Sequence, residues 1–155
     1  MDARVKPGHD DAWVGSGPRM TSDAGNGGCL CGAVRFQTDG APKWVAHCHC
    51  NSCRRTTGAA MTTYAGFARG HVKFVKGAVK AFASSPGVSR GFCAACGTPL
   101  SYEGERWPDE IHLFVCTFDD PASFRPQAHV YTAEQLPWLQ IDDDLRRYAK
   151  TAGAS

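Results

Sequence analysis

Short apolar segments alternate with glycine and proline turns along most of the chain, a pattern that predicts strands. Residues 33–37 alternate apolar and polar side chains, and residues 61–67 are rich in residue types that favour pleated surfaces. Further candidate strands lie at 43–48, 71–75, 79–83, 88–92 and 100–102, and the clearest is 110–118. Many short strands with regular turns indicate a mainly β protein, either a sandwich or folded-over sheets.

Helical periodicity is scarce. We expect little helix beyond a short turn after Ser52, another at 121–124 and a terminal turn at 142–148. Residues 1–26 are rich in Gly, Asp, Pro and Ser and show no apolar periodicity, so they are expected to form a flexible tail, with Met20 as an alternative start. Residues 27–150 are expected to form one domain.

The composition is that of an ordinary soluble globular chain: 155 residues, 43% hydrophobic and 21% charged. A formal net charge of +2 is too small to argue for a nucleic-acid partner, and the densest basic runs are only the pairs Arg54–Arg55 and Arg146–Arg147. No apolar stretch is long enough to span a bilayer, so no membrane association is expected.

Seven of the eight cysteines fall into three tight clusters. Thiols two or three residues apart can share one metal ion, and three such clusters favour metal over thiols that are merely buried or a redox pair. The N-terminus shows no secretory signal, so reduced thiols, bound zinc and a cytoplasmic location are the better interpretation. The clusters are Cys29 and Cys31; Cys48, Cys50 and Cys53; and Cys93 and Cys96.

The spacing suggests two zinc ions with different roles. The two pairs together supply four thiolates, which close a tetrahedral shell and are typical of a structural site, whereas the triplet leaves one position open for chemistry. Cys29 and Cys31 are expected to share one face of an extended segment. Cys93 and Cys96 are expected to form a knuckle in which Gly97 frees the backbone after the second ligand.

Histidines flank the triplet but are not expected to complete it. His47 and His49 lie on the strand face opposite Cys48 and Cys50, so they could only support the ligands indirectly, or be half-buried strand residues. The eighth cysteine, Cys116, alternates with two phenylalanines and is expected to pack in the core.

The three cysteine-containing segments resemble those of one protein family. Residues 28–34, 48–58 and 92–100, followed by 126–131 and 136–138, resemble the glutathione-dependent formaldehyde-activating enzymes, a family that includes centromere protein V. The match covers roughly residues 27–148. The resemblance implies a β-tent fold of small antiparallel sheets pinned by zinc.

The same resemblance implies site roles and a reaction. It implies a structural zinc on Cys29, Cys31, Cys93 and Cys96, and a catalytic zinc on Cys48, Cys50 and Cys53. The family reaction joins glutathione to formaldehyde and gives S-hydroxymethylglutathione, the reverse of a carbon–sulfur lyase reaction. The expected partners are therefore a small thiol such as glutathione and a small aldehyde.

Other functional residues are candidates by chemistry alone. His49, with His47 and His129 as alternatives, could move the proton. Basic residues could face anionic glutathione, namely Arg54, Arg55, Lys73 and Arg90. The competing hypothesis is a zinc-stabilised protein-binding module, which would need an exposed apolar patch around Trp107 or Trp138, although core packing is favoured for both.

Overall fold

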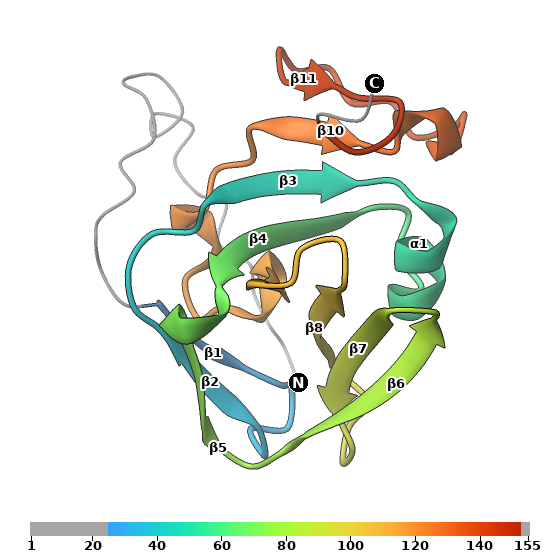
Figure 1. Ribbon diagram of the computed structural model, residues 1–155. Coiled ribbons are helices and arrows are strands. Elements are labelled where there is room, and N and C mark those ends of the chain that lie inside the picture. The colour runs from blue at the N-terminus through green and yellow to red at the C-terminus, as the bar shows by residue number, and fades with distance from the viewer. Residues whose placement is uncertain (1–24, 153–155) are drawn as a thin grey trace, which may run out of the picture.

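A computed structural model of the protein describes residues 25–152 as two β-sheets with little helix (Figure 1). The smaller sheet has the order β1-β2-β5 and the larger has the order β11-β10-β3-β4-β9-β8-β7-β6. Pairing is antiparallel, except that β10 runs parallel to both β3 and β11. The predicted mainly β architecture with little helix is confirmed.

The strands are short. Those of the smaller sheet are β1 (Gly25–Gly28), β2 (Arg35–Thr38) and β5 (Val72–Lys76). Those of the larger sheet are β3 (Trp44–Cys48), β4 (Thr62–Ala68), β6 (Val79–Ser85), β7 (Val88–Cys93), β8 (Pro99–Gly104), β9 (Glu110–Phe114), β10 (Ala128–Val130) and β11 (Arg146–Arg147). In Figure 1, β5 and β6 diverge from a common turn like the two slopes of a tent.

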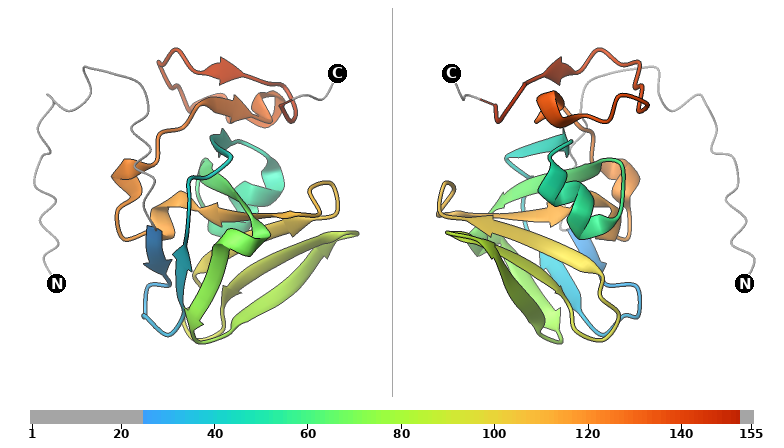
Figure 2. Two further views of the ribbon diagram at one scale, coloured as in Figure 1. Left: turned by 60° about the vertical axis from the view of Figure 1, so that its left-hand side comes forward. Right: turned by 90° about the vertical axis from the view of Figure 1, so that its right-hand side faces the viewer.

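Figure 2 shows the two sheets from two further sides, and the main core cluster contains buried side chains from strands of both. The largest fully buried apolar side chains come from four strands in both sheets: Phe36, Phe67, Leu100 and Leu113. β1 can lie close to the Phe36 ring because Gly27 has no side chain. A Cβ at Gly27 would lie 2.4 Å from that ring. A smaller buried cluster surrounds Cys48, Cys53, Tyr64 and Phe114.

One α-helix is present among the described residues, α1 (Asn51–Thr57), and it follows the end of β3 at the predicted turn after Ser52. Cys50 caps its N-terminus, accepting a hydrogen bond from the backbone N–H of Cys53, and Gly58 ends it in the left-handed conformation at φ 65°. The expected turn near residue 121 is confirmed as a 3-10 turn, Pro121–Ser123.

Two local predictions are wrong. Residues 142–148 contain the short strand β11 rather than a terminal turn, because the backbone there pairs with β10. The clearest predicted strand ends at Phe114, and a 3-10 turn, Val115–Thr117, leaves Cys116 exposed instead of packed in the core. Cys116 still alternates with phenylalanines in the sequence, but the 3-10 turn directs its side chain outward.

The expected tail at residues 1–26 and the alternative start at Met20 lie almost wholly outside the described residues; β1 already begins at Gly25. Between residues 25 and 152, no helix combines the length and hydropathy that a membrane crossing requires.

Candidate metal centres and the adjoining pocket

The first cysteine pair lies in the turn between β1 and β2. The N–H of Gly32 donates to the carbonyl of Cys29 at 3.1 Å, and Gly32 takes φ 78°. The prediction that Cys29 and Cys31 share an extended segment is therefore wrong, because a glycine able to adopt positive φ closes a tight turn there. The turn still brings the two Sγ atoms to 3.6 Å.

The second pair lies in the turn between β7 and β8, and here the predicted knuckle is confirmed. The N–H of Gly97 donates to the carbonyl of Cys93 at 2.8 Å, and Gly97 takes φ 78°. The two turns are tied together, since the N–H of Leu30 donates to the hydroxyl of Thr98 at 3.1 Å. The cluster therefore joins the smaller sheet to the larger one.

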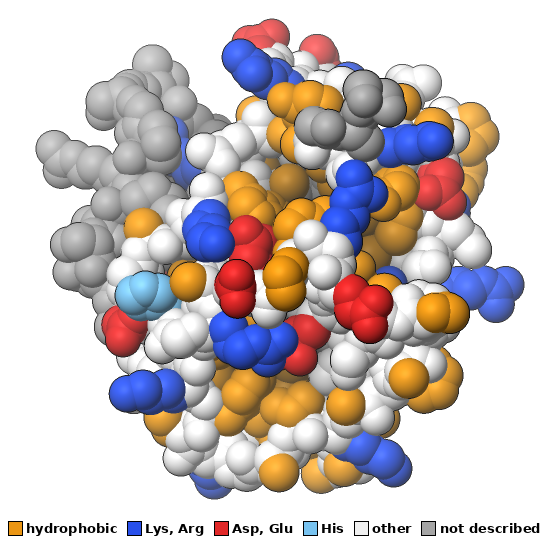
Figure 3. Space-filling view, in the orientation of Figure 1, with side chains coloured by type: hydrophobic (Ala, Val, Ile, Leu, Met, Phe, Trp, Pro, Cys, Tyr) orange, Lys and Arg blue, Asp and Glu red, His pale blue; other side chains and the backbone are white. Residues whose placement is uncertain are grey.

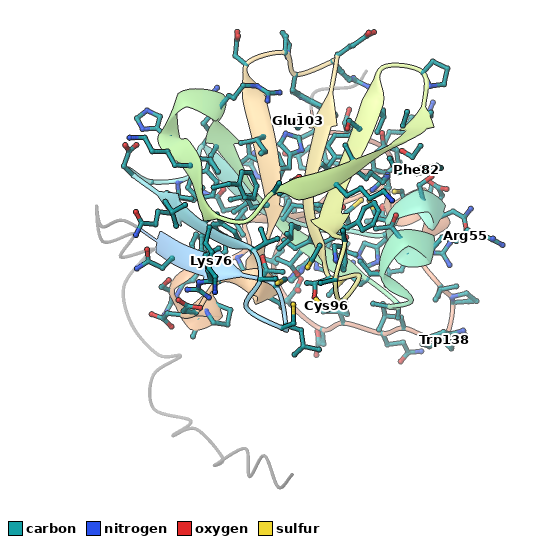
Figure 4. All side chains as sticks on the ribbon, turned by 90° about the horizontal axis from the view of Figure 1, so that it is seen from below. Arg55, Lys76, Phe82, Cys96, Glu103 and Trp138 are labelled. Carbon is teal, nitrogen blue, oxygen red and sulfur yellow. The ribbon has the colours of Figure 1, made fainter. Side chains whose placement is uncertain are left out.

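All four Sγ atoms lie within 4.8 Å of one another. A tetrahedral zinc ion with four Zn–S bonds of about 2.3 Å requires sulfurs about 3.8 Å apart. The observed distance of 3.9 Å from Cys31 to Cys93 fits that requirement. Cys31 and Cys96 are exposed, and Figure 4 labels Cys96 at the turn that follows β7. This cluster, Cys29, Cys31, Cys93 and Cys96, could hold a metal at the surface.

The triplet lies where a strand runs into a helix. Cys48 ends β3, Cys50 is the helix cap and Cys53 occupies the first turn of α1. Their Sγ atoms lie within 4.8 Å of one another, with 3.7 Å between Cys48 and Cys53. These three thiols could also hold a metal, and two of them are buried.

A polar network surrounds the sulfur of Cys53. The hydroxyl of Tyr64 donates to it at 3.5 Å, and the guanidinium of Arg90 lies 3.8 Å away. Hydrogen bonds from the Cys48 and Cys50 thiols, together with that from Tyr64, lower the pKa of Cys53. Burial, with the nearby Cys53 sulfur, raises the pKa of Tyr64, so its hydroxyl keeps the proton it donates.

Of the four basic residues proposed from charge, the structure brings only Arg90 to the triplet, from β7. The side chain of Arg54 donates to the backbone carbonyl of His49. Arg55 points outward from α1 in Figure 4, and Lys73 is exposed on β5 in the other sheet.

Beside the triplet lies a cavity of about 760 Å³. Its lining comes from the central strands of the larger sheet and from C-terminal residues that include β10 and β11, and Cys50 and Cys53 are part of it. The face in Figure 3 is hollowed above its centre, where mainly hydrophobic side chains line the depression. A cavity of this size is within the usual range for small-molecule sites.

Sequence reasoning missed most of this lining. The residues it missed include six aromatic side chains: Trp44, Tyr64, Tyr102, His112, Tyr131 and Tyr148. Trp107 also lines the cavity, and Trp138 is 70% exposed, so core packing is wrong for Trp138. The strand-favouring residue types at 61–67 predict the strand that carries Tyr64, but nothing local identifies the strands that lie beside it.

Two of the three candidate histidines, His49 and His129, are buried and form a hydrogen-bonded chain outside the cavity lining. His49 Nε2 lies 2.8 Å from His129 Nδ1, and His129 Nε2 lies 2.9 Å from a carboxylate oxygen of Asp143. His47 instead meets the Thr63 hydroxyl at 2.8 Å. Burial lowers the pKa values of His47 and His49 to about 4. As expected from the strand faces, neither ring joins the three sulfurs.

Known proteins share both sequence and fold with this chain. The family model described as glutathione-dependent formaldehyde-activating enzyme matches residues 24–134. A Halomonas elongata protein, provisionally named a glutathione-dependent formaldehyde-activating enzyme, is 28% identical over 127 residues, covering 75% of this chain and 80% of its own length. A crystal structure of a Rhodobacter sphaeroides protein from structural genomics superposes with a TM-score of 0.52 at 24% identity, covering 61% of this chain and 87% of that one.

Proposed function

Because the chain belongs to the glutathione-dependent formaldehyde-activating enzyme family, we propose that it is a zinc enzyme of the carbon–sulfur lyase type. It joins a thiol such as glutathione to a small aldehyde such as formaldehyde. The observation that carries this proposal is the cysteine triplet, which places three sulfurs within reach of one ion at the edge of a cavity. Three protein ligands leave one coordination position for a substrate atom.

The reaction is a simple addition. The thiol sulfur forms a bond to the carbonyl carbon, the carbon–oxygen π bond breaks, and the thiol proton ends on the oxygen as a hydroxyl. Nothing is oxidised or reduced. Run in reverse, the same step breaks a carbon–sulfur bond.

In this proposal Cys48, Cys50 and Cys53 hold the catalytic zinc. When bound, the ion would keep a thiol ionised at neutral pH or polarise a carbonyl. Three thiolates and Zn²⁺ carry a net charge of −1, which the guanidinium of Arg90 offsets from 3.8 Å. The Tyr64 hydroxyl holds the Cys53 sulfur in place with its hydrogen bond.

The second zinc belongs to Cys29, Cys31, Cys93 and Cys96 and is structural. Its four ligands come from turns of both sheets, which supports treating residues 27–150 as one zinc-binding domain. The two proposed zinc sites use seven of the eight cysteines as thiolates, which supports a reducing compartment such as the cytoplasm.

A catalytic role for His49 is the least supported of the proposed assignments. Its ring does not line the cavity, and its Nε2 is engaged with His129. The chain from Asp143 through His129 to His49 instead suits a supporting role, in which it fixes the backbone between Cys48 and Cys50.

Zinc content and activity together test the proposal. Wild type is expected to bind two zinc ions and to consume glutathione and formaldehyde. A Cys48→Ser/Cys50→Ser/Cys53→Ser variant is expected to bind one zinc and lose activity, and the single Cys50→Ser variant guards against a folding defect. Cys116→Ser, an exposed cysteine outside both clusters, serves as the matched control.

Full activity in the triple variant would contradict the catalytic role of the triplet. A folded wild type with two zinc ions and no activity towards any thiol and aldehyde pair would instead favour the zinc-stabilised binding module.

A further inference from the structure

Five aromatic rings, from β3, β4, β8, β9 and the loop between β8 and β9, form a continuous surface that lines the cavity. We call this surface the aromatic wall; it consists of Trp44, Tyr64, Tyr102, Trp107 and His112. His112 is its centre. The His112 ring centroid lies 4.5 Å from that of Trp44, 5.3 Å from those of Tyr102 and Trp107, and 6.5 Å from that of Tyr64.

Specific contacts hold this wall in place. The Trp44 ring lies against β4 where Gly66 has no side chain, because a Cβ at Gly66 would sit 2.3 Å from it. One carboxylate oxygen of Glu110 accepts hydrogen bonds from Trp44 Nε1 at 3.3 Å and from His112 Nε2 at 3.0 Å. Rings fixed in this way are pre-organised for a ligand.

Part of the aromatic wall is left uncovered by the described residues. Trp44, Tyr102 and Trp107 are only half-buried, and all three line the cavity. Half-buried aromatic side chains that line a concave surface are characteristic of small-molecule sites.

Charge around the cavity favours an uncharged ligand group. The charged side chains of the lining are Arg90, Arg146, Glu110 and Glu134, so the lining offers no excess of positive charge. Arg90 is already directed at Cys53 and Tyr64. A carboxylate buried against this wall would gain little compensation for lost hydration, whereas a flat apolar ring would be stabilised by edge and face contacts.

We propose that the aromatic wall binds a planar, uncharged ring carried by the aldehyde, so that the preferred aldehydes are aromatic rather than formaldehyde. This inference rests on the proposed function, because the triplet, whose Cys53 sulfur accepts a hydrogen bond from Tyr64 of the aromatic wall, takes the reacting sulfur. The product is a thiol adduct whose new carbon carries a hydroxyl and the ring. As for formaldehyde, one carbon–sulfur bond forms and the thiol proton ends on oxygen.

Equilibrium binding separates this inference from catalysis. The probes are the S-benzyl and S-methyl thioethers of glutathione, stable analogues of the aromatic and one-carbon adducts, measured by calorimetry on the zinc-loaded protein. Wild type is expected to bind the benzyl compound at least tenfold more tightly. Trp107→Ala is expected to reduce that preference to about twofold, while Trp138→Ala, an exposed tryptophan outside the cavity lining, keeps it.

Equal affinity for the two thioethers, no binding of either, or a preference that survives Trp107→Ala would each overturn the inference. Turnover is measured separately with glutathione and either benzaldehyde or formaldehyde. Selective binding of the benzyl compound without turnover of either aldehyde would support the aromatic wall as a ring-binding surface and would contradict the proposed reaction. Turnover of formaldehyde without a preference for the benzyl compound would support the proposed reaction and would contradict the role of the aromatic wall.

Discussion

The two cysteine clusters use the same chemistry in opposite surroundings. The four-cysteine cluster lies in two facing turns at the surface, with Cys31 and Cys96 exposed. The triplet lies at a strand–helix junction, with Cys48 and Cys53 buried beside a cavity. The first has enough thiols to close a metal shell, whereas the second has one thiol too few and borders a cavity.

The difference teaches that ligand number and surroundings together distinguish a structural site from a reactive one. The closed cluster links strands of both sheets, so its metal would contribute to folding directly. The open cluster is braced by its own helix cap and by Tyr64, so the local fold does not depend on a fourth ligand.

The largest expected effect comes from breaking the closed cluster. A Cys93→Ser/Cys96→Ser variant is expected to be unfolded at 25 °C, because structural zinc supplies about 10–16 kcal/mol to small domains, comparable with the whole free energy of unfolding. Circular dichroism and zinc content check this. A variant that melts with wild-type cooperativity at the wild-type temperature would remove the structural role.

An intermediate effect is expected at the open cluster. Arg90→Gln leaves the buried Cys53 sulfur without its cation, and we expect activity with glutathione and formaldehyde to fall by about 10–100-fold, in the range of losing one charge-assisted contact. Arg55→Gln, exposed on the adjoining helix, should leave the rate unchanged. If both variants lose the same activity, the rate depends on the overall positive charge around α1 and not on the contact of Arg90 with Cys53.

The smallest effect concerns the cavity wall alone. Gly66→Ala would place a Cβ 2.3 Å from the Trp44 ring, so the indole must move, and we expect the free energy of unfolding to fall by about 1–3 kcal/mol. Gly70→Ala meets nothing within 4 Å and should change it by less than about 0.5 kcal/mol. Urea unfolding of both variants, with zinc content as a check, measures the difference. Equal effects would mean that Trp44 is not held by this contact.

Much of the fold was predictable because it is written in local patterns. The alternation at residues 33–37 and the strand-favouring residue types at 61–67 predicted strands that overlap β2 and β4. The strands that escaped prediction, β1, β10 and β11, have two to four residues each, too few for a periodic signal. Their pairing with other strands, and not their own sequence, makes them extended.

The sequence by itself determined which cysteines belong together locally, because thiols two or three residues apart are held close by the backbone alone. It also determined the knuckle at Gly97, whose positive φ suits only a few residues. Tertiary structure decided which clusters meet, since the packing of the two sheets against each other brings Cys31 within 3.9 Å of Cys93. It also decided that Arg90 and the aromatic wall face the triplet, because those side chains come from strands whose order in the sheet no local pattern specifies.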